Sequence, residues 1–383
     1  MTNHDAWAIQ KTILQMEFPF IVLKSLQFAL FRTYGIPTIS TLLLKTSQFS
    51  DTATSFKRYA DTGTLIGEFM AFDPDSERAQ TAIARTNFLH KGYRASGKIL
   101  DEDMLYTLSL FAMEPIRFVK LYEWREMTGM ERCAIGTYWK SLGDALGIAY
   151  DLLPSGKIGF RDGIHWLEEV SMWSQDYEAR HMKPHPRNKE IADKTLDVLV
   201  YNLPEFMKPI GVYFASFLMD EILRNAMMYA SMLSRRVGCF EDKSTDIYRF
   251  RIDRPPALFA AIFGSMLQLR RLYLRYVALP RPNFMRLDVF TEVPNQNGRN
   301  FVLFYDGAPF YVQPTMWNRW GPVAWFKWGL GLPLPGDDGD KYYPQGYYTP
   351  DLGPKYFEGK GRKELDVIKE SIRVQRIGRC PFP

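Results

Sequence analysis

The stretch DPDSERAQTAIARTNFLHKGYRASG, residues 73–97, predicts a helix with one unusual residue on its apolar side. An acidic start and Gly97 near the far end are typical helix boundaries. Between them, Ala79, Ile83 and His90 recur at helical spacing. His90 is one of only five histidines in 383 residues. A histidine in such a position is either a hydrogen-bonded core residue or a metal ligand.

Helical patterns of apolar residues run through most of the chain before Pro280, and the residue pattern changes after it. Residues 286–294 and 299–314 suit short strands or extended segments, and residues 317–361 are crowded with glycine, proline and aromatic residues. We therefore predict an all-α protein, with one helical domain over 1–280 and an irregular extension over 281–383 that packs on the same core. Further helices are expected over 56–70, 101–124, 129–148, 163–181, 182–203, 209–234 and 255–278.

The composition argues against several classes of protein. The net charge is only +5 and the 48 lysines and arginines are scattered, so no nucleic-acid-binding surface is expected. Cys133, Cys239 and Cys380 are far apart and suit neither a disulfide framework nor a zinc finger. The chain has no glycine loop for a nucleotide and no GxSxG motif. Aromatic residues make up 15% of the chain, which favours a pocket for flat or apolar ligands.

Two apolar segments raise the question of membrane contact. The run FPFIVLKSLQFALF, residues 18–31, contains Pro19 and Lys24 and is too short and polar to span a bilayer, so we expect a buried helix. Four tryptophans lie between Trp317 and Trp328. We expect them to cover the helical core. Peripheral contact with a membrane surface is the alternative, because tryptophan favours the bilayer interface.

The residues around His90 suit a haem site. On a helix, Thr86, His90, Tyr93 and Arg94 share one face. A neutral histidine on an apolar helix can bind a haem iron through one ring nitrogen. Haem propionates also need cations, and Arg85 and Arg94 are close enough in sequence to provide them. These residues alone leave other interpretations open, including that of a core histidine.

A second candidate element is KRYADT, residues 57–62. Arg58 and Thr62 are four residues apart, so they lie one turn above each other on the same helix face. Arg58 could hold a propionate or polarise bound dioxygen, and Thr62 could donate a hydrogen bond. Taken alone, the pair better suits a surface arginine and a threonine inside a helix.

Several long and unusual strings occur along the chain. They include KRYADT…LIGEF, RTNFLHKGY, DMLYTLSLFAMEPIRF, GTYWKSLGDALGI, PTMWNRWGP, GLPLPGDDGDKYYPQGY and GPKYFEGKG. Through these strings the chain resembles, over nearly its whole length, fungal oxygenases bound to the endoplasmic reticulum, of the mycophenolic-acid pathway type (MpaB-like). That group is distantly related to the latex-clearing rubber oxygenases.

The resemblance implies a cofactor, a reaction and a set of residues. Members of these groups carry haem b in an all-helical core. The rubber oxygenases use it to cleave an isoprenoid double bond with dioxygen, and the pathway enzyme cleaves a farnesyl side chain oxidatively. In the rubber enzymes, an arginine and a threonine four apart come before the axial histidine. Arg58, Thr62 and His90 resemble that trio, with His90 32 residues after Arg58, so His90 is expected to be the iron ligand.

Two departures from the rubber enzymes affect the distal side of the haem. Those enzymes have a lysine just before the threonine, where this chain has Asp61. They also have an upstream glutamate that acts as a base, and the corresponding region here reads STLLLKT, residues 40–46. A base, if one is needed, would be Asp61, Glu68 or a residue further along the chain. The membrane-spanning N-terminus of the family also looks shortened in this chain.

The combined interpretation is a haem b-dependent oxygenase that uses dioxygen to cleave or oxidise a prenyl or polyene double bond of a lipophilic secondary metabolite. Arg58, Asp61 and Thr62 are the expected catalytic residues. The expected location is the endoplasmic reticulum membrane or the cytoplasm. Alternatives are a haem-dependent cyclase or isomerase, a non-enzymatic haem or lipid carrier, and a membrane-surface scaffold without haem.

Overall fold

The structure is a computed structural model that describes residues 1–46, 52–229, 256–305, 307–376 and 380–382. Within these residues it has fifteen α-helices and no β-strand, which confirms the predicted all-α class. The helices are α1 Asn3–Thr12, α2 Pro19–Thr33, α3 Pro37–Lys45, α4 Thr52–Ala71, α5 Glu77–Ala95, α6 Asp101–Tyr122, α7 Gly129–Ala145, α8 Gly163–His181, α9 Pro186–Leu199, α10 Lys208–Leu218, α11 Glu221–Ala226, α12 Ala257–Tyr276, α13 Met316–Trp320, α14 Pro322–Gly329 and α15 Arg362–Arg376.

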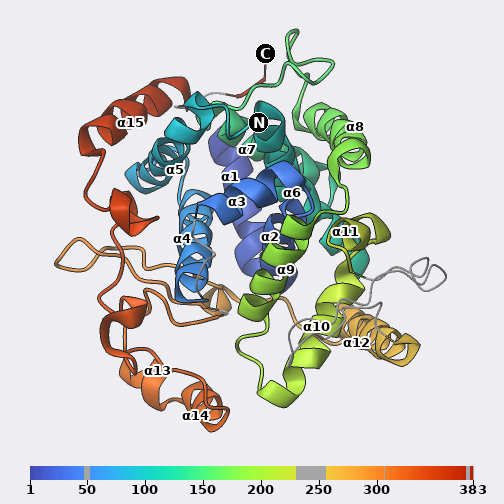
Figure 1. The fold of residues 1–383 in the computed structure, drawn as a ribbon, viewed down its shortest axis with the longest axis vertical. Coiled ribbons are helices and arrows are strands. Elements are labelled where there is room, and N and C mark those ends of the chain that lie inside the picture. The colour runs from blue at the N-terminus through green and yellow to red at the C-terminus, as the bar shows by residue number, and fades with distance from the viewer. Residues whose placement is uncertain (47–51, 230–255, 306, 377–379, 383) are drawn as a thin grey trace.

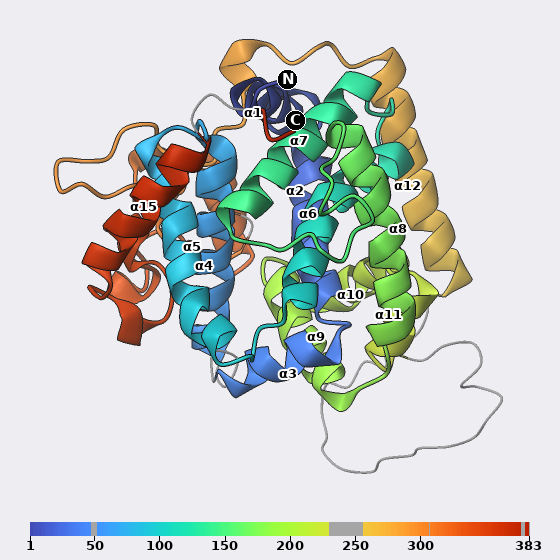
Figure 2. The ribbon, with the colours of Figure 1, turned by 90° about the horizontal axis from the view of Figure 1, so that it is seen from above.

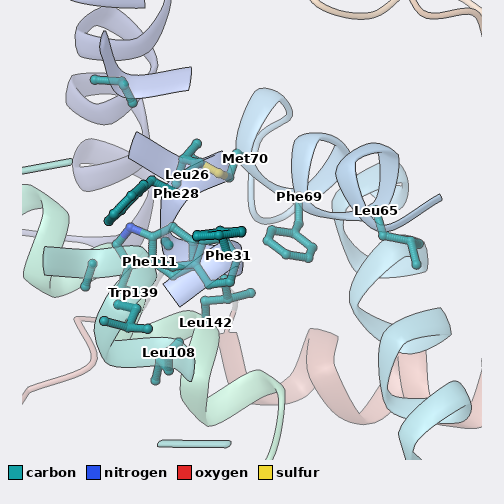
Figure 3. Close-up of a cluster of buried hydrophobic side chains, with 14 of the residues drawn as sticks. Leu26, Phe28, Phe31, Leu65, Phe69, Met70, Leu108, Phe111, Trp139 and Leu142 are labelled. Atoms are coloured by element: carbon teal, nitrogen blue, oxygen red, sulfur yellow. The ribbon is translucent and has the colours of Figure 1, made fainter. Parts of the chain in front are cut away.

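The centre of the molecule is the packing of α2 against α6, which lie together in both views (Figures 1 and 2). Helix α7 packs on α1 and α8, while α4 and α5 form a neighbouring pair that α15 covers on the α5 side. Apolar side chains from α2, α4, α6 and α7 meet in a buried cluster (Figure 3). Burial of such side chains supplies most of the favourable free energy of folding.

A buried ionic network joins α2 to three other elements. The guanidinium of Arg32 donates to both carboxylate oxygens of Glu178, at 2.7 and 2.6 Å, and to Asp220 at 2.6 Å. The hydroxyl of Tyr106 donates to Glu178 at 2.8 Å. Because breaking a buried pair leaves an uncompensated charge, this network holds α2, α6, α8 and the start of α11 in register.

The predicted helix over 209–234 is wrong. Helix α10 ends at Leu218, and α11 begins at Glu221. The cause is Asp220, whose Oδ1 accepts the backbone N–H of Leu223 at 2.9 Å and whose Oδ2 binds Arg32. An aspartate that caps a new helix in this way ends the preceding one. Residues 230–234 lie outside the described residues.

Apart from the short helices α13 and α14, the chain between Pro280 and α15 has little regular structure. In its described part, β pairing is limited to two isolated bridges, Phe290 with Val302 and Asn300 with Tyr347. Its last part packs on α5 and α4. The carbonyl of Gly353 accepts from Lys57 at 3.0 Å. Gly353 has a φ of 113°, and a Cβ there would lie 3.1 Å from Leu89, so only glycine fits this close approach.

The two apolar segments differ in exposure. Helix α2 is buried along Ile21, Val22 and Phe31, as expected for residues 18–31. None of the described helices is by itself long and apolar enough to cross a bilayer. The segments Asn3–Glu17 and Pro19–Thr33 reach that length and composition only together, and they are bent by 111°.

The expectation that the tryptophans cover the core is wrong. In α13 and α14, Trp317, Trp320, Trp325 and Trp328 are 76%, 61%, 55% and 64% exposed. These short helices lie at the lower end of the molecule, away from α2 and α6 (Figure 1). They cannot cover the core because they have little contact with it.

Candidate active site

A cavity of about 320 Å³ lies between α4, α5 and α6. Residues of α2, α3, α7 and α9 complete its wall, together with the C-terminal segment 353–357. Much of the lining is apolar, including Leu65, Phe69, Phe111, Trp139 and Leu142. All five belong to the cluster in Figure 3. The volume lies within the usual range for small-molecule and cofactor sites.

His90 lines this cavity from α5. Its Nδ1 is buried and has no hydrogen-bond partner among the described residues. Burial, with smaller contributions from Arg58 and Arg94, lowers the pKa of His90 to about 4. The imidazole is therefore neutral at physiological pH, which is the form that binds metal ions. A buried polar nitrogen without a hydrogen-bond partner lowers the stability of the fold, so such a group in a cavity wall calls for an explanation such as a bound ligand.

Arg58 and Thr62 line the same cavity from α4. Burial lowers the pKa of Arg58, and the phenol of Tyr34, the carboxylate of Asp61 and the phenols of Tyr93 and Tyr356 oppose that shift. The phenols of Tyr93 and Tyr356 are hydrogen-bonded to each other, and burial is the main cause that raises the pKa of Tyr356 to about 12. Arg58 is thus a buried cation among largely uncharged polar groups.

Asp61 is a buried carboxyl in the cavity wall. Its Oδ2 accepts from Lys57 at 2.7 Å, and its Oδ1 accepts from the hydroxyl of Tyr311 at 2.5 Å. Burial raises the pKa of Asp61, while Lys57 and Tyr311 act in the opposite direction. A carboxyl with a raised pKa in this setting can accept or return a proton more readily than an ordinary aspartate.

Glu68 is placed differently. Its side chain is fully buried, binds Arg78 and accepts from the hydroxyl of Tyr347. It does not line the cavity. Of the two named candidates for a base, Asp61 lines the cavity and Glu68 does not.

Only some of the predicted cofactor-binding residues line the cavity. Tyr93 lines the cavity, whereas Arg85 and Arg94 do not. Arg85 donates to the backbone carbonyls of Leu352 at 2.8 Å and Phe357 at 3.1 Å. Arg94 donates to the carbonyls of residues 146 and 147 at 3.1 and 2.7 Å. Both arginines therefore fasten loops to α5.

Sequence reasoning did not identify several polar residues of the wall. Tyr34 and Thr195 come from α2–α3 and α9 and are hydrogen-bonded to each other. Tyr356 comes from the C-terminal segment, and Asp103 from the first turn of α6. Asp103 is the last of three consecutive acids at the start of a helix, and that run is visible in the sequence. The same run is also common at helix starts without any role in a site, because acids there interact favourably with the helix dipole. The others had no local signal.

An apolar cavity with a neutral histidine, a buried cation and a buried acid is typical of enzymes that bind an organic cofactor or substrate. Residues 24–265 match the family described as "ER-bound oxygenase mpaB/B'/Rubber oxygenase, catalytic domain". The chain belongs to this family, which confirms the resemblance and makes the protein an oxygenase.

Similar proteins support the same family assignment. The chain is 52% identical over 382 residues to the ER-bound oxygenase mpaB' of Penicillium brevicompactum, a match that covers 100% of this chain and 85% of the relative. It is 47% identical over 355 residues to mpaB of the same organism, covering 93% of this chain and 78% of that protein. A third match, mpaB of Penicillium roqueforti (strain FM164), is 62% identical over 229 residues, which are 60% of this chain and 77% of the relative.

Proposed function

We propose that this oxygenase uses haem b to oxidise a carbon–carbon double bond in the prenyl or polyene chain of a lipophilic secondary metabolite, leading to cleavage of that bond. The observation that carries the proposal is His90, a neutral imidazole in the wall of an apolar cavity, with a buried Nδ1 that has no partner among the described residues. An axial haem ligand needs this chemical form.

The residues present fit haem. His90 would supply the axial nitrogen, and Arg58 would supply the positive charge for a propionate, with Tyr93 beside it. Neither Arg85 nor Arg94 is part of this set, because their guanidinium groups bind backbone carbonyls. Apolar walls suit the porphyrin face and exclude water. When bound, haem supplies the redox chemistry that activates dioxygen.

The chain's own side chains would then orient the reactants and control protons. Thr62 shares the face of Arg58, so its hydroxyl can donate a hydrogen bond to a polar reactant in the cavity. Asp61, fixed by Lys57 and Tyr311, can accept or return a proton at one carboxylate oxygen. The lining from α6 and α7, such as Phe111 and Trp139, would hold an apolar chain in place.

Two experiments test the proposal. Protein expressed with a haem precursor should show a Soret band and yield haem b on extraction. The loaded protein should consume dioxygen when a prenylated compound is added. A Soret band without dioxygen consumption but with a changed product would favour the cyclase or isomerase alternative. Protein that remains colourless after such expression would contradict the proposal.

The proposed location is the surface of the endoplasmic reticulum membrane. Both relatives from Penicillium brevicompactum are named as ER-bound. In this chain, α13 and α14 present four exposed tryptophans together with Phe326, which is 69% exposed. Exposed tryptophans partition to the bilayer interface. A lipophilic substrate could then reach the cavity from the membrane.

A further inference from the structure

The cavity wall also contains the carboxyl group of Asp103 on α6. Asp101, Glu102 and Asp103 all lie in the first turn of α6, where acids favour the helix dipole. The side chains of Asp101 and Glu102 are 61% and 45% exposed, and an acid can interact favourably with the helix dipole without being buried. Asp103, in contrast, is only 6% exposed. The helix dipole does not explain why this carboxylate is buried in a cavity wall.

The two oxygens of Asp103 have different surroundings. Oδ1 accepts from the hydroxyl of Tyr177 at 2.5 Å and from the hydroxyl of Thr38 at 2.9 Å. No described residue donates to Oδ2, and this oxygen is not among the fully buried atoms that lack a partner. The protein therefore fixes the carboxylate through one oxygen and leaves the other as an acceptor.

Asp103 comes from a different element than the other candidate residues, since it lies on α6 while His90 lies on α5 and Arg58 on α4. The remaining wall that α6 contributes is mostly apolar, with Met104, Leu108 and Phe111. The carboxyl of Asp103 is thus a polar group in a mainly apolar part of the lining.

We propose that Oδ2 of Asp103 accepts a hydrogen bond from a hydroxyl of the lipophilic ligand and fixes the ligand's polar end. This inference rests on the proposed function and adds a residue that would position the ligand through one of its hydroxyl groups. A hydroxyl is suited because it donates the one hydrogen bond that the carboxylate lacks. A hydrogen bond to a charged acceptor in an apolar cavity discriminates strongly against a ligand without the donor.

The test compares geraniol with geranyl methyl ether, which has the same prenyl chain but no hydroxyl donor. Binding to the haem-loaded protein is measured by titration calorimetry. The unaltered protein should bind geraniol about tenfold or more tightly than the ether. Asp103→Asn should abolish or reverse that preference, because it can place an N–H₂ donor where Oδ2 stood. The matched control Asp101→Asn, in the same turn but exposed, should keep it.

A second variant distinguishes ligand binding by Asp103 from a purely structural role of this residue. Tyr177→Phe removes a donor to Oδ1 and loosens the same contact between α8 and α6, but it leaves Oδ2 intact. It should lower thermal stability and keep the preference for geraniol. Equal affinities for the two ligands in the unaltered protein would overturn the inference, even if Asp103→Asn fails to fold. The Soret band, recorded on the same samples, reports on the proposed function separately.

Discussion

The buried Nδ1 of His90 distinguishes this residue from the other histidines. His165 pairs with Glu169 at 3.0 Å, and His185 accepts the backbone N–H of Arg187 at 3.1 Å at the start of α9. His181 stacks on Tyr177 with ring centroids 4.5 Å apart. None of these three lines the cavity. At the residue scale, His90 is therefore the candidate for the iron ligand.

His90→Ala should lower haem affinity by more than about a hundredfold, because the iron–imidazole bond anchors the cofactor. Helical circular dichroism should stay largely unchanged, since the apolar core does not depend on this side chain. The absorption spectrum and extracted haem measure the effect, with His165→Ala as the control. Full haem content with an unchanged spectrum in His90→Ala would move the assignment to His165, His181 or His185.

The carboxyl of Asp61 should appear in the pH dependence of the reaction. Burial raises its pKa, so its proton is lost at a higher pH than that of an ordinary aspartate. If the ionised form acts as a base, dioxygen consumption should rise with pH through that raised pKa. Asp61→Asn should remove this acidic limb and most of the activity while the Soret band remains. An acidic limb that survives in Asp61→Asn would exclude Asp61 as the base.

At the scale of elements, one helix presents two different faces to its surroundings. On α4, Arg58 and Thr62 face the cavity. Lys57, about 100° around the helix, instead binds Asp61 and the carbonyl of Gly353. The position of α4 beside α5 brings Arg58 and His90 to the same cavity.

Arg58→Ala should therefore weaken haem binding roughly tenfold, since it removes the buried cation expected to meet a propionate. Lys57→Ala should change haem content less. It should instead lower the free energy of unfolding by about 3 kcal/mol, because it leaves the buried Asp61 without its cation. Haem titration and thermal denaturation measure the two effects. Equal losses of haem in both variants would remove the support for this face of α4 as part of the cofactor site.

At the scale of the whole molecule, exposed aromatic residues gather on α13 and α14. The cations of this segment are engaged within the protein. Arg319 pairs with Asp337 at 2.9 Å, and Lys327 lies 3.7 Å above the ring of Tyr305. Membrane contact through this surface would therefore depend on aromatic side chains more than on charge.

The protein should co-sediment with liposomes at moderate salt, with only a weak dependence on ionic strength. Trp317→Ala and Trp320→Ala should each reduce the bound fraction severalfold with little change in thermal stability, because both side chains are exposed. Met172→Ala, which removes an exposed apolar side chain of α8, is the control. Protein that stays in the supernatant, with tryptophan variants that change only stability, would exclude this surface as a membrane contact.

The helical class and the approximate extent of helices such as α4 and α5 could be predicted from the sequence by local rules, because helical periodicity sets which side chains share a face. The choice of Arg58, Thr62 and His90 as candidates also needed the family resemblance, since spacing alone left structural roles open for all three. The break at Asp220 was missed. Its capping contact with Leu223 is local, but the ion pair that fixes its side chain is with Arg32, 188 residues away in the chain.

Only the tertiary structure decided which polar groups face the cavity. Arg85 and Arg94 are near His90 in sequence, yet they bind carbonyls of segments that fold against α5. Asp61 is fixed by Tyr311, 250 residues further along, and Asp103 by hydroxyls from two other helices. Buried polar groups take whichever partners packing brings within reach, and that choice depends on contacts between distant segments, which local spacing does not encode.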